Sequence, residues 1–152
     1  MGISGSGKST LGKHLAEILG IPFLDADDFH PRKNVMKMSR GTPLKDDDRC
    51  PWLAAIGNFV IASHRNEYVL SCSALKQSYR DYLDQRTDNT YVYLSISEGA
   101  AIERMNQREG HFMKARMVKS QLATLEPPSN AIELIHTLDM KEQVAEILKH
   151  LA

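Results

Sequence analysis

The sequence has no excess of charge of either sign. Nineteen lysine and arginine residues balance nineteen aspartate and glutamate residues among 152, so the formal net charge at pH 7 is zero. A chain without net charge has no broad electrostatic field with which to attract a polyanion or a membrane surface. We therefore expect no nucleic acid and no membrane among its partners, and any anionic ligand must be bound by local groups.

Cysteines and long apolar runs are scarce as well. Cys50 and Cys72 are the only cysteines, and their separation is typical of reduced thiols rather than of a disulfide framework. The longest mostly apolar run, residues 53–62, is too short to cross a bilayer, and the N-terminus has no basic-then-apolar secretory signal. These absences favour a cytoplasmic protein. The length and the 42% of hydrophobic residues favour a single domain over residues 1–152.

What the sequence does have is a phosphate-binding loop at its start. Residues 2–9 match the pattern G-x-x-x-x-G-K-[ST]. Glycines at positions 2, 5 and 7 allow the backbone to curl, so that successive N–H groups face one anion. Lys8 can reach the β- and γ-phosphates, and the Ser9 hydroxyl suits Mg²⁺. The apolar spacing over residues 10–19 predicts the helix that such a loop feeds, although a flexible Gly/Ser-rich start is the alternative interpretation.

The strand that normally leads into such a loop is missing. A phosphate loop usually follows a buried parallel strand, yet only Met1 precedes Gly2 here. Burial of five or six apolar side chains in that strand contributes on the order of 10 kcal/mol, comparable to the stability of a whole domain. The sequence therefore predicts either a start upstream of Met1 or a sheet with a gap.

Strands and helices are predicted to alternate along the rest of the chain. The expected strands are residues 21–24, 68–72, 91–95 and 131–137, and the expected helices are residues 10–19, 31–38, 46–64, 74–85, 98–108, 115–125 and 140–151. Residues 109–113 are expected to form a loop. Connections of this length allow crossovers, so we expect an α/β fold with a parallel sheet covered by helices on both faces. In the longest helix, Trp52, Ile56, Phe59 and Val60 have core spacing.

Two carboxylates follow the first predicted strand. Asp25 and Asp27 stand two residues apart, so in an extended chain both would face the same side, at the edge where parallel sheets place ligands. One carboxylate can hold Mg²⁺ through water while the other accepts the proton of an alcohol that attacks the γ-phosphate. The alternative is a solvated turn in which an aspartate caps a helix.

Four basic residues are candidates for binding anions. Arg104 and Arg108 lie four apart on one predicted helical face, next to a glycine that could serve as the hinge of a lid over residues 104–120. An arginine that closes over the phosphates would neutralise charge that develops during transfer; otherwise the pair only complements the helix dipole. Arg49 is either an ion-pair partner within its helix or a fork for a substrate carboxylate. Lys76 at a helix start suggests an anion nearby.

Two patterns that would indicate other phosphate-loop proteins are missing. No predicted apolar strand ends in the acidic residue expected of a motor ATPase, and no guanine-reading N-K-x-D tetrapeptide occurs. The residues alone therefore favour a small-molecule kinase, without choosing between a sugar acid, shikimate and a nucleoside monophosphate as the acceptor.

Blocks spread over almost the whole chain resemble the signature segments of gluconokinases in the shikimate-kinase-like group. They are residues 2–9, 25–31, 34–38, 41–49 with 51–53, 72–76 with 79–81, 108–113 and 124–128. The resemblance implies a P-loop NTPase fold of the shikimate and nucleoside-monophosphate kinase type, and a homodimer. It also implies phosphorylation of D-gluconate to 6-phospho-D-gluconate with ATP and Mg²⁺.

The residue patterns and the resemblance together assign roles to individual residues. The predicted catalytic residues are Lys8, Asp27 and Arg108. The predicted ATP contacts are Gly2, Ile3, Ser4, Gly5, Ser6, Gly7, Lys8, Ser9, Arg104, Arg108 and Pro127, the last in a segment expected to line the adenine. The predicted contacts of the sugar acid are Asp27, His30, Arg49, Lys76 and His111, and the predicted metal ligands are Ser9 and Asp25. Because the first strand is absent, a catalytically impaired nucleotide-binding module is the alternative of a different class.

Overall fold

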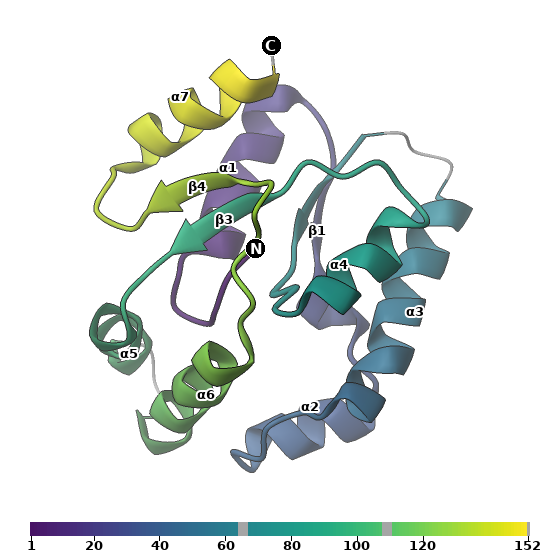
Figure 1. Cartoon of the computed structure of the whole chain (residues 1–152), viewed down its shortest axis with the longest axis vertical. Helices are drawn as coiled ribbons and strands as arrows, with labels where there is room; N and C mark the ends of the chain where they lie inside the picture. The colour runs from purple at the N-terminus through teal and green to yellow at the C-terminus, as the bar shows by residue number, and fades with distance from the viewer. Residues whose placement is uncertain (64–66, 108–110, 152) are drawn as a thin grey trace.

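The phosphate loop leads directly into a helix, as the sequence predicts. A computed structural model describes residues 1–63, 67–107 and 111–151, with the backbone alone for residues 111–115. In chain order (Figure 1) its elements are α1 (Lys8–Leu19), β1 (Phe23–Asp25), the 3₁₀ segment η1 (Ala26–Phe29), α2 (Arg32–Ser39), α3 (Asp46–Ala62), β2 (Val69–Ser71), α4 (Gln77–Asp84), β3 (Val92–Ser95), α5 (Glu98–Asn106), α6 (His111–Thr124), β4 (Ile132–Ile135) and α7 (Met140–Leu151). Strands and helices therefore alternate as expected.

The strands of the described residues form two parallel pairs rather than one sheet. β1 pairs with β2, with Phe23 opposite Val69, and β3 pairs with β4, with Val92 opposite Ile132. The α/β fold with parallel strands is confirmed. The described strands leave a gap between the two pairs.

Met1 and Gly2 span the gap between the two pairs. The Leu94 amide donates a hydrogen bond to the Met1 carbonyl oxygen (3.0 Å), and the Gly2 amide donates to the Ser73 carbonyl oxygen (3.3 Å). Figure 1 shows the N-terminus between β3 and β1. Two residues thus tie β3 to the chain that follows β2, and they hold the phosphate loop at the carboxyl ends of the strands.

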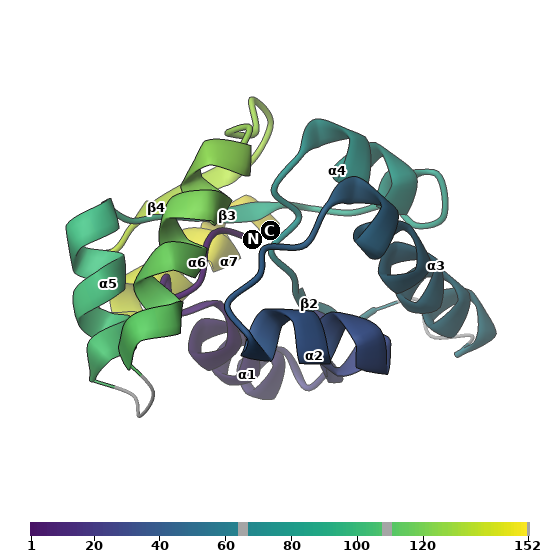
Figure 2. The same cartoon turned by 90° about the horizontal axis from the view of Figure 1, so that it is seen from below.

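Helices cover both faces of the strand pairs. On one face α1 and α7 pack on β3 and β4 through a cluster that includes Leu11, Leu134 and Ile147. On the other face α3 and α4 pack through a cluster that includes Trp52 and Leu83, against which Leu24 and Leu70 are half-buried. Helices α5 and α6 lie side by side at one end of the molecule, away from α3 and α4 (Figure 2).

Three sequence predictions about local structure are wrong. α4 begins at Gln77 rather than at residue 74, because Ala74 has a left-handed φ of 42° that helices do not tolerate. The expected loop over residues 109–113 is helical from His111 onward, since α6 begins there. Phe59 is 46% exposed instead of buried, and its ring packs edge-on against Phe29 (5.1 Å between ring centres).

Two further observations concern the cysteines and the lengths of the helices. Cys50 and Cys72 are both free thiols. Among the described helices, none has the length and apolar content that a membrane crossing requires.

Strand β4 offers a direct test of the packing. Leu134 is 1% exposed, whereas its neighbour Ile135 is 52% exposed. Leu134→Ala should lower the free energy of unfolding by ~2–5 kcal/mol, because a buried leucine leaves a cavity. Ile135→Ala, the matched control, should change it by ~0.5 kcal/mol. Urea denaturation measures both; a larger loss for Ile135→Ala would mean that β4 turns its other face to the core.

Candidate active site

The phosphate loop has the backbone conformation that its glycines predict. Gly2, Gly5 and Gly7 have φ values of 139°, 83° and 98°. At Gly5 a Cβ atom would also lie 2.7 Å from the Ala101 carbonyl oxygen, so no other residue fits there without displacing α5. Gly7 is the N-cap of α1. The loop therefore ends at a helix N-terminus, where backbone N–H groups and the helix dipole favour an anion.

The loop is anchored to the surrounding helices. Ile3 is 1% exposed in a cluster with Ala101 of α5 and Val118 of α6. The Ser4 amide donates to Gln121 Oε1 of α6 (2.6 Å). These contacts fix the position of the loop against α5 and α6.

Arg104 lies next to the loop, as a predicted ATP contact should. Its Nη1 donates to the Ser6 carbonyl oxygen (3.4 Å), and its Nη2 donates to the His136 carbonyl oxygen (3.1 Å). Nη1 also lies 3.9 Å from the position of a Cβ atom on Gly7. The guanidinium thus brings positive charge to the rim of the phosphate loop from the end of α5.

Ser9 and Asp25 meet beneath the loop. The Ser9 hydroxyl donates to Asp25 Oδ2 (2.8 Å) and lies 3.1 Å from the Ser71 hydroxyl, and Lys8 Nζ donates to the Ile3 carbonyl oxygen (2.9 Å). A hydroxyl beside a carboxylate offers the hard oxygen ligands that a small divalent cation prefers. Over the described ranges no group of three His, Cys, Asp or Glu residues could hold a metal by itself. An ion between Ser9 and Asp25 would therefore take its remaining ligands from water and from the nucleotide.

Asp27 lies beside Asp25, although not for the predicted reason. The strand ends at Asp25, and Asp27 belongs to η1, where its amide donates to Asp25 Oδ1 (3.1 Å). Desolvation by the surrounding protein raises the pKa of the Asp27 carboxyl, the Asp25 charge raises it further, and Lys8 lowers it. Because 84% of the side chain is exposed, water limits the desolvation, and the Asp25 charge is the firmer cause.

His30 lies on the other side of Asp27. Its Nε2 is 3.9 Å from Asp27 Oδ1, and its ring stacks on Trp52 with 4.6 Å between the ring centres. Trp52 Nε1 in turn donates to the Ala26 carbonyl oxygen (2.6 Å), which fixes η1 against α3. Burial and the nearby Arg49 charge lower the pKa of His30 to about 4, so its ring is neutral at pH 7.

Arg49 is buried behind His30. Its Nη1 donates to the Leu44 carbonyl oxygen (2.8 Å) and to the Tyr79 hydroxyl (3.4 Å). No hydrogen bond joins its Nε or Nη2 to any residue that the structure describes. One edge of the guanidinium fork therefore remains for a ligand.

Lys76 meets an anion, as its position suggested, but the anion is a side chain of the protein. Lys76 Nζ donates to both carboxylate oxygens of Asp46 (2.9 and 2.7 Å), and the Tyr79 hydroxyl also donates to Asp46. The bonds from Lys76 and Tyr79 lower the pKa of the Asp46 carboxyl. A role of Lys76 in binding substrate stays a prediction, since its charge is already paired.

Two residues near Arg49 had no functional role in the sequence prediction. The hydroxyl of Tyr79 links Arg49 to Asp46. Asn34 is fully buried: its Nδ2 donates to the Asp48 carbonyl oxygen (2.7 Å) and lies 3.4 Å from His30 Nδ1, while its Oδ1 has no partner in the described part of the chain. Periodicity does not reveal either role, because both depend on neighbours far along the chain.

Three predicted residues are not brought to this centre by the described structure. Arg108 lies outside the described residues, and so does the side chain of His111. Pro127 is exposed in the connection between α6 and β4. Its neighbour Glu126 is held by the Leu75 carbonyl oxygen and by Arg80 Nη2, at 2.8 and 2.9 Å.

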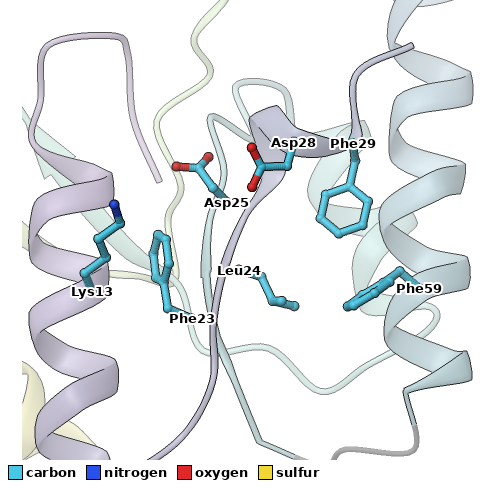
Figure 3. Close-up of a pocket in the computed structure, with 7 residues that line it drawn as sticks. All are labelled: Lys13, Phe23, Leu24, Asp25, Asp28, Phe29 and Phe59. Atoms are coloured by element: carbon cyan, nitrogen blue, oxygen red, sulfur yellow. The ribbon is translucent and has the colours of Figure 1, made fainter.

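A separate cavity adjoins the centre. It measures about 460 Å³ and is lined by Lys13, Phe23, Leu24, Asp25, Asp28, Phe29 and Phe59. Figure 3 shows the carboxylates of Asp25 and Asp28 at one end, and Phe29 and Phe59 facing each other on one side. Of the predicted site residues only Asp25 reaches it, so the cavity borders the candidate site without containing it.

The loop, its helix and the flanking carboxylates define a P-loop kinase. A family model described as shikimate kinase matches residues 4–151. The gluconokinase of Gluconobacter oxydans (strain 621H) is 43% identical over 160 residues, which cover 99% of this chain and 88% of that protein. The thermoresistant gluconokinase of Escherichia coli (strain K12) is 44% identical over 131 residues, which cover 84% of this chain and 75% of that protein.

A solved structure of a gluconokinase is also similar to this chain. The crystal structure of a gluconokinase from Sinorhizobium meliloti 1021 has a TM-score of 0.88 and 46% identity, and the match covers 99% of this chain and 88% of that one. The chain therefore belongs to the gluconokinases of the shikimate kinase family. It is an enzyme that uses ATP and a divalent metal ion to phosphorylate a small molecule.

The stacked His30 ring predicts a specific pH dependence. Its pKa in the folded protein is about 4 against an ordinary value near 6.5, so between these values the unfolded chain binds a proton that the folded chain does not. The free energy of unfolding should therefore fall on acidification from pH 6.5 to 4, with a His30 contribution on the order of 3 kcal/mol. His30→Phe, which keeps a ring against Trp52, should flatten this part of the curve measured by urea denaturation; an unchanged slope would contradict the assignment.

Proposed function

We propose that the protein transfers the γ-phosphoryl group of ATP to the 6-hydroxyl of D-gluconate, giving 6-phospho-D-gluconate and ADP. The relatives reported above are named gluconokinases. The observation that carries the proposal is a continuous series of groups from the phosphate loop to a buried arginine. The Lys8 charge lowers the pKa of Asp27, and His30 Nε2 lies 3.9 Å from Asp27 Oδ1. The Arg49 charge in turn lowers the pKa of His30.

Asp27 is the group that would receive the proton of the attacking hydroxyl. The oxygen of the alcohol forms a bond to the γ-phosphorus while the bond from that phosphorus to the bridging oxygen of ADP breaks. The alcohol proton passes to the Asp27 carboxylate. A raised pKa makes this carboxylate a better base.

The phosphate loop would hold the nucleotide for this step. The N–H groups around Gly5 and Gly7 would bind the phosphate oxygens, and Lys8 and Arg104 would neutralise charge as it moves toward the leaving group. Mg²⁺ is the divalent ion that we propose, because it keeps waters and takes only one or two protein oxygens, here from Ser9 and Asp25. Held by these two residues, the ion would supply positive charge that stabilises the phosphates.

Arg49 would select an acid. Its Nε–Nη2 edge matches the two oxygens of a carboxylate, and its other nitrogen is fixed by Leu44 and Tyr79. The neutral His30 ring accepts at Nδ1 from Asn34, which leaves its Nε2 proton on the side of Asp27. This proton can donate to a substrate hydroxyl. An acid with hydroxyl groups between its carboxylate and its reacting alcohol therefore suits the series.

Some assignments stay predictions. They are the homodimer, the cytoplasmic location, the absence of a nucleic-acid partner, the single domain over residues 1–152, the lid over residues 104–120, and the roles of Arg108, Lys76, His111 and Pro127. Of the lid, the described parts belong to α5 and α6.

ADP release on a panel of acceptors tests the proposal. Gluconate should be phosphorylated, and glucose, its neutral counterpart, should react poorly because it leaves the buried Arg49 charge without a partner. Shikimate and nucleoside monophosphates should be inactive. Turnover with a monophosphate alone would favour a nucleotide kinase. A shift in melting temperature with Mg-ATP but no turnover on any acceptor would favour the impaired nucleotide-binding module.

Asp27→Asn tests the base directly. The amide keeps the shape of the carboxylate but cannot accept the proton, so kcat should fall by ~10²–10⁴ while the KM for ATP changes little. In the unaltered enzyme activity should be lost as pH falls through the raised pKa of Asp27, because the carboxyl must be ionised. Asp28→Asn, at the exposed neighbouring position, should keep kcat. Equal changes in kcat and in the KM for ATP would limit Asp27 to positioning the nucleotide.

A further inference from the structure

Asn34 of α2 is a buried amide that is only half satisfied. The residue is 0% exposed, and its Nδ2 donates to the Asp48 carbonyl oxygen (2.7 Å). The same Nδ2 lies 3.4 Å from His30 Nδ1, whereas Oδ1 has no partner among the described residues. A half-satisfied buried amide stabilises a core less than an apolar side chain does. The two bonds that Nδ2 makes therefore matter for their direction rather than for stability.

The Asp48 carbonyl fixes the orientation of the amide. A carbonyl oxygen only accepts hydrogen bonds, so the amide group 2.7 Å away is the NH₂ and not the oxygen. Asp48 lies in the first turn of α3, where its carboxylate accepts from the Lys45 amide (2.8 Å) and from Lys37 Nζ. The start of α3 thus holds the carbonyl in the position that sets the Asn34 side chain.

The amide in turn fixes the tautomer of His30. An NH₂ group only donates, so Nδ1 accepts, and the single proton of the neutral ring resides on Nε2. Trp52 stacks on the ring and keeps it in the plane in which Nδ1 meets Asn34. Two charged groups act on the same ring. Asp27 Oδ1 lies 3.9 Å from Nε2, and burial together with the Arg49 charge lowers the pKa of the ring. Arg49 therefore favours a neutral ring, and Asn34 decides which nitrogen carries its proton.

The position of that proton matters because a reacting alcohol brings only one proton of its own. His30 Nε2 and Asp27 Oδ1 are close enough for a single oxygen to lie within hydrogen-bond distance, about 2.8 Å, of both. An alcohol at this point accepts from Nε2–H with one lone pair and gives its proton to Asp27, so its other lone pair is left for the γ-phosphorus. With the ring proton on Nδ1, the Nε2 lone pair would compete with Asp27 for the alcohol proton.

We propose that Asn34 is a positioning residue for phosphoryl transfer, because it makes His30 present an N–H rather than a lone pair to the oxygen that attacks beside Asp27. That oxygen forms a bond to the γ-phosphorus, its proton passes to Asp27, and the bond from phosphorus to ADP breaks. The His30 proton stays on Nε2 throughout. The inference rests on the proposed function for the reacting alcohol, whereas the tautomer of His30 is independent of it.

The ¹⁵N NMR signals of the His30 ring, identified by their loss in His30→Phe, test the tautomer without any substrate. In the unaltered protein at pH 7, Nε2 should be protonated and Nδ1 should not. In Asn34→Asp the new carboxyl group can accept from the ring, so Nδ1 should carry a proton. Asn34→Leu removes the donor and should give averaged signals of two exchanging tautomers. Asn58→Asp, the same change at an exposed position of α3, should leave the signals unchanged.

Two NMR results would overturn the proposal. One is a protonated Nδ1 in the unaltered protein, a measurement that requires no variant to fold. The other is a set of His30 signals that neither Asn34→Asp nor Asn34→Leu alters, since the tautomer would then be set by another group.

The pH profile of gluconate phosphorylation tests the consequence for the reaction. In Asn34→Asp, a ring with protons on both nitrogens still donates from Nε2, but the ring that has lost one proton keeps the other on Nδ1. The kcat of this variant should therefore fall roughly tenfold as pH rises through the His30 titration, because a competing acceptor replaces a hydrogen bond to the reacting oxygen. The unaltered enzyme should show no such alkaline loss.

The kinetic outcomes separate this inference from the proposed function. A fall in kcat of Asn34→Asp that is the same at every pH would reduce Asn34 to a structural residue and overturn its positioning role. An unaltered enzyme that phosphorylates no acid would instead refute the proposed function, and with it the role in catalysis. The ¹⁵N signals would still decide whether Asn34 sets the tautomer of His30.

Discussion

The structure depends on the backbone hydrogen bonds of two residues, Met1 and Gly2. They connect β3 with the end of β2, and the phosphate loop begins at the point where they meet. On one side of the loop α5 and α6 supply Arg104 and Gln121. On the other side the end of β1 supplies Asp25, and η1 supplies Asp27. A loop that is held from both strand pairs brings the two halves of the candidate site together.

Burial increases along the candidate site from Asp27 to Arg49. Asp27 is largely exposed, His30 is nearly covered, and Arg49 is buried. A small acid that enters with its carboxylate first would reach the arginine and leave its far hydroxyl near Asp27. The same arrangement explains why His30 is neutral, since a second cation beside Arg49 would repel it in a place with little water.

Much of this was predictable from sequence, and the failures have physical causes. The loop, its helix and the order of elements follow from local patterns, and α7 has the predicted bounds. The predicted start of α4 was wrong because the apolar spacing of the sequence does not reveal the left-handed φ of Ala74. Asp27 was paired with Asp25 through strand geometry, whereas a 3₁₀ turn joins them. Tyr79 contacts Arg49 and Asp46, which lie 30 and 33 positions away in the sequence. No local pattern reveals contacts over such a separation.

The single tryptophan has a consequence for observing this molecule. Trp52 is 1% exposed and its indole lies flat against the imidazole of His30, beside the place where an acid would bind. All tryptophan fluorescence thus comes from one buried side chain in contact with the site. A protonated imidazole quenches a stacked indole, whereas a neutral one quenches it less, so the fluorescence of the unlabelled protein reports the ionisation of a single ring.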